Sequence, residues 1–214
     1  MTRNTARQNK ASAKRHSKPS VQARSGGDNR VRIIAGQFRG RWIEFPDTPG
    51  LRPTGNRIRE TLFNWVGQRL DDKICLDLFA GSGALGFEAA SRGAARVVLV
   101  ENAPEAIHSL NRNRERLHAG TCQLVRANAM EYLAESKEFF DLIFVDPPFA
   151  SGFMVKILSI AGHRLSPKGM VYCEWGEPLE DVIANPGVGT WEIVRQGKAG
   201  VVHFALLALP EPAP

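Results

Sequence analysis

The chain has 214 residues, 43% of them hydrophobic and 23% charged, which is ordinary for a soluble globular protein and enough for one well-buried domain with an appendage. Its formal net charge of +6 is uneven, because residues 1–30 carry +7, residues 31–70 carry +4 and residues 71–214 carry −5. Three scattered cysteines argue against a disulfide framework or a zinc site, and no segment resembles a signal peptide or a membrane span, so we expect a cytoplasmic protein without membrane contacts.

Residues 1–30 are rich in Lys, Arg, Asn, Ser and Gly. This composition cannot bury enough apolar surface to offset the entropy of ordering, so we predict a disordered basic arm. Each phosphate that Lys or Arg neutralises releases counterions, which makes nucleic acid the natural partner. A solvated tail that only keeps the protein soluble explains the charge equally well.

Residues 31–70 predict a small N-terminal module. Residues 32–36 and 41–45 are typical of two short strands around a turn. Residues 54–66 have helical periodicity, with one apolar face formed by Ile58, Leu62, Phe63 and Val66.

From residue 71 onward, short apolar segments alternate with amphipathic ones. Strands are predicted over residues 73–79, 96–101, 122–126, 141–145 and 169–174, and helices over residues 85–91, 104–117, 129–135 and 153–163. This alternation implies a doubly wound α/β fold with a mainly parallel sheet. Residues 191–196 and 201–209 predict a C-terminal β-hairpin, and an antiparallel pair closing a parallel sheet fits a methyltransferase better than a dehydrogenase.

A glycine-rich loop follows the first parallel strand. Gly81, Gly83 and Gly86 form a G-x-G-x-x-G pattern, which lets backbone N–H groups approach a bound nucleotide. Glu101 ends the next strand, where its carboxylate can accept hydrogen bonds from ribose hydroxyls. These features fit NAD as well as S-adenosylmethionine. Asp77 favours S-adenosylmethionine, because a carboxylate there attracts the amino group of the methionine moiety and repels a pyrophosphate.

Three neighbouring residues belong to the same predicted cofactor site. Phe79 and Ser82 lie in the glycine-rich loop, and Asn102 follows Glu101 directly. We expect all three to line the cofactor.

A second motif indicates the reaction. The apolar strand over residues 141–145 leads into Asp146, Pro147, Pro148 and Phe149, at the edge of the sheet where α/β proteins bind ligands. An exocyclic amine is a poor nucleophile, and Asp146 with the Pro147 carbonyl can accept its two N–H groups and orient the lone pair. Pro148 fixes the backbone and Phe149 can stack on the base. A Pro-Pro turn without a catalytic role is the structural alternative.

Asn128 and Ala129 follow the third parallel strand. In this fold the Asn128 amide can bind the adenine N6 while the Ala129 N–H donates to N1. An N-cap for the next helix is an equally good interpretation of Asn128.

The segment from Arg52 to Arg59 surrounds a predicted helix start. Thr54 is a natural helix cap, so a structural role is open for it and for the nearby Arg57. The functional alternative is a lid, with Arg52 and Thr54 over the methionine end of the cofactor and arginines facing RNA phosphates.

Together these motifs resemble the bacterial RsmD family of 16S rRNA guanine(966) N2-methyltransferases, over about residues 31–209. The resemblance implies a class I S-adenosylmethionine methyltransferase domain over residues 71–214, with a seven-stranded sheet, and a guanine amino group of the small ribosomal subunit as acceptor. We expect no metal, and we expect a monomer. The motifs that carry the resemblance are Arg52-Pro53-Thr54, Arg57, Arg59, Glu60, Leu62-Phe63-Asn64, Asp77 to Gly86, Glu101, Asn128-Ala129 and Asp146-Pro147-Pro148-Phe149.

Two other functions remain open at this point. An adenine-N6 DNA methyltransferase uses the same Asp-Pro-Pro-aromatic chemistry, although this chain has no room for a separate target-recognition domain. A non-catalytic RNA-binding protein would explain the basic arm but would leave both motifs without a role.

Overall fold

The computed structural model describes residues 29–47, 53–147, 153–176 and 179–210. The predicted arm, residues 1–30, lies almost wholly outside these ranges, so its disorder stays a prediction. Within them, no helix is long and apolar enough to cross a membrane.

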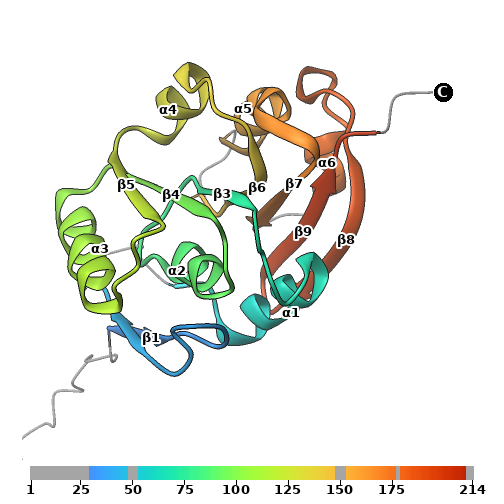
Figure 1. Ribbon diagram of the computed structural model, residues 1–214. Coiled ribbons are helices and arrows are strands. Elements are labelled where there is room, and N and C mark those ends of the chain that lie inside the picture. The colour runs from blue at the N-terminus through green and yellow to red at the C-terminus, as the bar shows by residue number, and fades with distance from the viewer. Residues whose placement is uncertain (1–28, 48–52, 148–152, 177–178, 211–214) are drawn as a thin grey trace, which may run out of the picture.

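Seven strands form one sheet in the order β5-β4-β3-β6-β7-β9-β8, and within this sheet β9 alone runs opposite to the other six strands (Figure 1). The predicted doubly wound, mainly parallel fold with an antiparallel C-terminal hairpin is therefore confirmed. The strands are β3 (Ile74–Asp77), β4 (Arg96–Glu101), β5 (Cys122–Arg126), β6 (Phe140–Val145), β7 (Leu165–Trp175), β8 (Glu192–Ala199) and β9 (Val202–Ala208).

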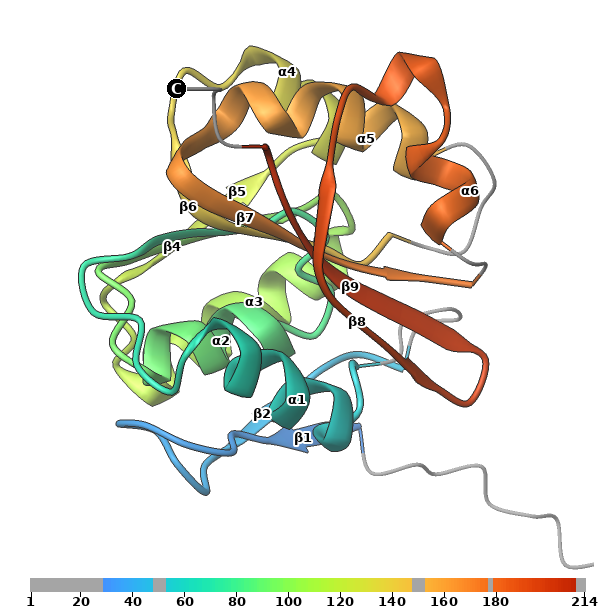
Figure 2. The same ribbon diagram turned by 90° about the vertical axis from the view of Figure 1, so that its right-hand side faces the viewer.

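Helices cover both faces of this sheet. Figure 2 shows α1, α2 and α3 on one face together with the small hairpin of β1 (Arg30–Arg32) and β2 (Trp42–Glu44), and α4, α5 and α6 on the other. The helices are α1 (Asn56–Val66), α2 (Ala84–Ser91), α3 (Pro104–Leu117), α4 (Ala129–Glu135), α5 (Phe153–Ala161) and α6 (Leu179–Ile183), with 3₁₀ turns at Gly162–Arg164 and Pro186–Val188.

The sheet separates two hydrophobic cores, and β4 shows how the sequence supplies both. Val97 and Leu99 point to the core shared with α2 and α3, whereas Val98 and Val100 point to the core shared with α4 and α5. All four side chains are fully buried, and each such burial stabilises the fold by about 1.5–3 kcal/mol. This two-sided burial explains why β4 appears in the sequence as a continuous apolar run.

The N-terminal hairpin differs from its prediction. Its strands are β1 (Arg30–Arg32) and β2 (Trp42–Glu44), so the first strand ends before most of the predicted range 32–36. The reason is that the backbone N–H groups of Ile34 and Ala35 donate to the Glu88 carboxylate of α2, at 2.8 and 3.0 Å, and not to a partner strand.

One helix start was predicted wrongly, and one short helix was missed. Helix α1 begins at Asn56, with Gly55 as its N-cap, so Thr54 is not the cap that the sequence suggested. Helix α6 was not predicted, because its five residues are too few to show helical periodicity.

Candidate active site

Four adjacent parallel strands bring the predicted site together. Strands β3, β4, β5 and β6 are neighbours in the sheet and run in the same direction, so their carboxyl ends meet at one edge (Figure 1). Each of them ends at or just before a polar side chain singled out in the sequence, namely Asp77, Glu101, Asn128 and Asp146.

Asp77 lies beneath the glycine-rich loop and is almost fully buried. Its Oδ2 accepts the Gly86 N–H at 2.9 Å, and a Cβ on Gly86 would lie 2.2 Å from Leu99 Cδ2. Burial is the main reason that the pKa of Asp77 rises to about 7, against the opposing hydrogen bond from Gly86. An ammonium group beside Asp77 would favour its ionised form, which suits the role predicted for this carboxylate.

Glu101 joins the glycine-rich loop to the end of β4. Its Oε2 accepts the Gly81 N–H at 2.9 Å, and its Oε1 accepts the N–H groups of Asn102 and Ala103 at 2.7 and 2.8 Å. A carboxylate has about four acceptor positions, so three backbone bonds leave one for a ribose hydroxyl.

The other predicted loop residues mostly support the loop itself. Gly81 and Gly83 have φ angles of 48° and 80°, a left-handed conformation that glycine adopts without strain. The Ser82 hydroxyl accepts the Ala84 N–H at 3.3 Å, and Phe79 packs, partly buried, on the core beneath α4 and α5.

Asn128 is the N-cap of α4. Its side-chain oxygen accepts the N–H groups of Met130 and Glu131, at 2.9 and 3.3 Å. Asn128 therefore has the helix-capping role that was the alternative to adenine binding. An adenine amine would have to share the Asn128 side-chain oxygen, which already accepts two N–H groups. Ala129 begins α4 beside it. An open hollow of about 240 Å³ lies here, lined by Asn102, Arg126, Ala127 and Asn128.

Asp146 follows β6 and its side chain is directed toward the segment before α1. The Thr54 hydroxyl donates to Asp146 Oδ2 at 3.3 Å. Burial raises the pKa of Asp146 to about 6, and the Thr54 hydrogen bond opposes that rise. Pro147 is buried beside it. Pro148, Phe149 and Arg52, three further predicted site residues, lie outside the described residues.

Arg59 does not contact RNA phosphates, contrary to the interpretation of its segment as an RNA-facing lid. Its side chain is fully buried, and its Nη1 donates to Glu88 Oε2 at 3.1 Å. Its Nε donates to the Thr54 carbonyl at 3.2 Å. Arg59 therefore fastens the backbone of Thr54, which in turn reaches Asp146.

Comparison with known proteins supports the fold described above. The family model described as conserved hypothetical protein 95 matches residues 31–208. Ribosomal RNA small subunit methyltransferase D of Escherichia coli is 41% identical over 184 residues, covering 84% of this chain and 90% of that protein. The chain belongs to the RsmD family.

Two further relatives, one compared by sequence and one by structure, support this family assignment. The Haemophilus influenzae protein of the same name is 34% identical, with 82% of this chain and 92% of that protein covered. The solved structure of yhhF from Escherichia coli superimposes with a TM-score of 0.73 at 39% identity, over 83% of this chain and 97% of that one. The family and the fold implied by the sequence motifs are thus confirmed.

Two side chains beside the candidate site, Glu174 and Tyr172, were not singled out in the sequence. The register of β6 and β7 pairs Val145 with Cys173, so the next residues, Asp146 and Glu174, stand at adjacent strand ends. Glu174 is 4% exposed, and its Oε1 accepts the Tyr172 hydroxyl at 3.0 Å. An acidic residue at the end of an otherwise apolar predicted strand was the available signal, since buried carboxyls are rare without a partner.

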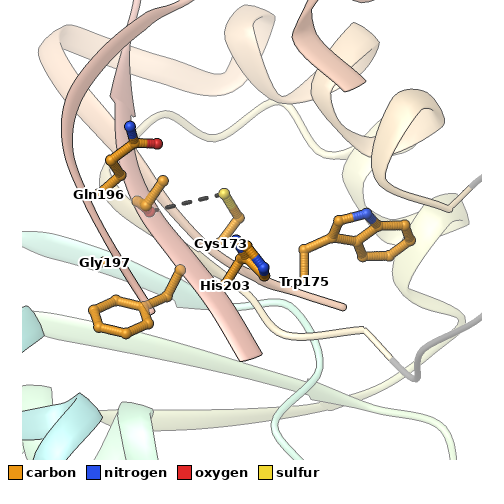
Figure 3. Close-up of a pocket in the computed structure, with 7 residues that line it drawn as sticks. Cys173, Trp175, Gln196, Gly197 and His203 are labelled. Atoms are coloured by element: carbon orange, nitrogen blue, oxygen red, sulfur yellow. Dashed lines mark hydrogen bonds between the residues drawn. The ribbon is translucent and has the colours of Figure 1, made fainter. Parts of the chain in front are cut away.

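A second cavity offers no alternative site. It lies between β7, β8 and β9, has a volume of about 20 Å³ and is drawn in Figure 3, where Cys173, Trp175 and His203 are among its labelled lining residues. This volume suffices for one water molecule at most. Among the residues that the structure describes, no group of His, Cys, Asp and Glu could hold a metal ion.

Proposed function

We propose that this protein transfers a methyl group from S-adenosylmethionine to the exocyclic N2 amine of a guanine in 16S rRNA of the small ribosomal subunit. The observation that carries the proposal is the placement of Asp146 beside the glycine-rich loop, on adjacent strands of a methyltransferase fold. The name of the Escherichia coli relative, ribosomal RNA small subunit methyltransferase D, supports the same substrate class.

The residues at the strand ends fit S-adenosylmethionine. Asp77 is a buried carboxyl with an elevated pKa, as expected where a cationic amino group is to be received. Glu101 retains an acceptor position for a ribose hydroxyl, and the hollow beside Asn102 and Asn128 can take a purine base. The cofactor supplies an electrophilic methyl group on a positively charged sulfur.

Asp146 would orient the acceptor. Its carboxylate accepts one N–H of the guanine amine and the Pro147 carbonyl accepts the other, so that the nitrogen lone pair points at the methyl group. The N–C bond forms as the S–C bond breaks, the bonding electrons remain on sulfur, and the nitrogen becomes cationic. Asp146 then takes the proton that the nitrogen releases and passes it to water. Orientation and electrostatics carry such a reaction without a covalent enzyme intermediate.

The charge of the chain supports an RNA substrate. Residues 1–30 carry +7, and the outer face of the β1–β2 hairpin exposes Arg30, Arg32 and Trp42, with the Arg30 guanidinium 4.6 Å from the Trp42 ring centroid. Basic groups beside an aromatic ring favour contact with phosphates and bases. A ribosomal substrate would place the reaction in the cytoplasm.

The test is methyl transfer in vitro. Small subunits from cells that lack the enzyme are incubated with labelled S-adenosylmethionine, and the modified nucleoside is identified by mass spectrometry. We expect N2-methylguanosine in 16S rRNA, formed about 10²- to 10⁴-fold more slowly with Asp146→Asn. Label on adenine of duplex DNA, or no label on subunits, would overturn the proposal.

A further inference from the structure

A second buried carboxyl lies against Asp146 and has no role in the proposed reaction so far. Glu174 is on β7, and its Oε1 accepts the Tyr172 hydroxyl at 3.0 Å. The Thr54 hydroxyl lies close enough to lower the pKa of Glu174. The same Thr54 hydroxyl donates to Asp146 Oδ2 at 3.3 Å. Thr54 therefore stands between two carboxyl groups on adjacent strands.

Two carboxylates at adjacent strand ends, one buried and one half-buried, cannot both be ionised at low cost. Burial, then the charge of Asp146, raises the pKa of Glu174 to about 8, while the hydroxyls of Tyr172 and Thr54 oppose the rise. The ionisable groups that act most strongly on Glu174 are acids. The groups facing it are Asp146 after β6, Asp77 on β3, Tyr172 and Cys173 on β7, and the hydroxyl of Thr54 before α1.

We propose that Glu174 is a positioning residue for methyl transfer. In its neutral form it donates to the oxygen of Thr54, so that the Thr54 hydroxyl proton points at Asp146. The carboxylate of Asp146 is then held by one oxygen and presents the other to the acceptor amine. This inference rests on the proposed function.

The alignment of Asp146 depends on which of the two carboxyl groups accepts the Thr54 hydroxyl proton. A hydroxyl has one proton, so Thr54 can donate to only one of the two carboxyls at a time. When Glu174 loses its proton it competes for that donor and repels the charge on Asp146. The chain Glu174 to Thr54 to Asp146 therefore aligns the site only while Glu174 is neutral.

The first test is the pH dependence of the single-turnover rate on small ribosomal subunits. The rate of the wild-type protein should show a bell-shaped dependence on pH, with an acid limb near pH 6 from Asp146 and a basic limb near pH 8 from Glu174. Glu174→Gln keeps a neutral donor, so the rate at neutral pH should persist and the basic limb should vanish. Tyr172→Phe removes a bond that favours the ionised form, so the basic limb should move to higher pH.

A second variant separates positioning from packing. Glu174→Ala should lower the rate about 10- to 100-fold with little change in affinity for S-adenosylmethionine, and Glu174→Gln should restore the rate. Glu192→Gln on the exposed side of β8 makes the same chemical change away from the site and should keep the wild-type profile. Melting curves confirm that each variant is folded.

A titration without substrate distinguishes this inference from the proposed function. In protein labelled with ¹³C at Glu carboxyls, the resonance missing in Glu174→Gln should titrate near pH 8. If the wild-type protein transfers no methyl group to subunits, the proposed function fails. If it does, but Glu174→Gln keeps the basic limb or the Glu174 resonance titrates near 4.5, the positioning role of Glu174 is wrong.

Discussion

Glu88 offers the sharpest test of how the N-terminal module is attached. Its carboxylate is fully buried and accepts two backbone N–H groups, from Ile34 and Ala35, and two guanidinium groups, from Arg59 at 3.1 Å and Arg92 at 2.9 Å. Glu88→Gln keeps the shape but removes the charge, so both buried guanidinium groups lose their anionic partner. Removing one member of a buried ion pair costs about 3–5 kcal/mol.

The matched control is Glu138→Gln. Glu138 pairs with Arg96 at 2.6 Å, but the two side chains are 39% and 34% exposed, and such pairs contribute at most about 1 kcal/mol. For a chain of this length, 1 kcal/mol moves the melting temperature by about 2–4 °C. We therefore expect differential scanning calorimetry to show a fall of about 6–20 °C for Glu88→Gln and of no more than about 4 °C for Glu138→Gln. Equal small shifts would refute the role of Glu88 as the buried anchor of the module.

Four further changes test other parts of the molecule. Asp146→Asn should slow methyl transfer by about 10²- to 10⁴-fold while calorimetry shows S-adenosylmethionine affinity nearly unchanged, and near wild-type turnover would exclude the orienting role. Gly36→Ala should destabilise the fold by about 2–5 kcal/mol in urea unfolding, because φ is 78° and a Cβ would lie 1.8 Å from the Ser91 carbonyl oxygen. The control is Gly120→Ala, which has open space around it and should change stability by less than about 0.5 kcal/mol. Deletion of residues 1–28 should weaken binding to the small subunit. It should also reduce the slope of log affinity against log salt concentration by about 0.7–0.9 for each phosphate that the arm neutralises. An unchanged slope would show that the arm makes no phosphate contacts. Glu174→Gln should reduce the loss of stability between about pH 4.5 and pH 8. The raised pKa of Glu174 stabilises the native state fully below about 4.5, and this contribution is lost as the pH rises through about 8, so the wild-type melting temperature should fall more over that range than that of the variant.

The sequence was sufficient for the mainly parallel sheet and for three of the residues at its edge. Strands Arg96–Glu101 and Cys122–Arg126 were predicted at their observed bounds. For Arg96–Glu101 the reason is burial on both faces, which makes the strand a short apolar run between helices with clear periodicity. Asp77, Glu101 and Asp146 were expected at one edge because parallel strands end on the same side of a sheet, and the observed strand order places them there.

The remaining features depend on contacts between segments far apart in the chain. Thr54 has the sequence signature of a helix cap, but its hydroxyl donates to Asp146, 92 residues away. From the sequence, Arg59 resembles a solvent-exposed arginine on an amphipathic helix. In the structure it is buried and donates a hydrogen bond to the buried Glu88 carboxylate. Glu174 becomes part of the site only through the register of β6 and β7, which local patterns do not determine.

The most direct test of the central claim is mass-spectrometric mapping of 16S rRNA from cells with and without this protein. We predict that one N2-methylguanosine disappears when the protein is absent, returns with the wild-type gene and does not return with Asp146→Asn. An unchanged set of 16S rRNA methylations in the deletion strain would contradict the account.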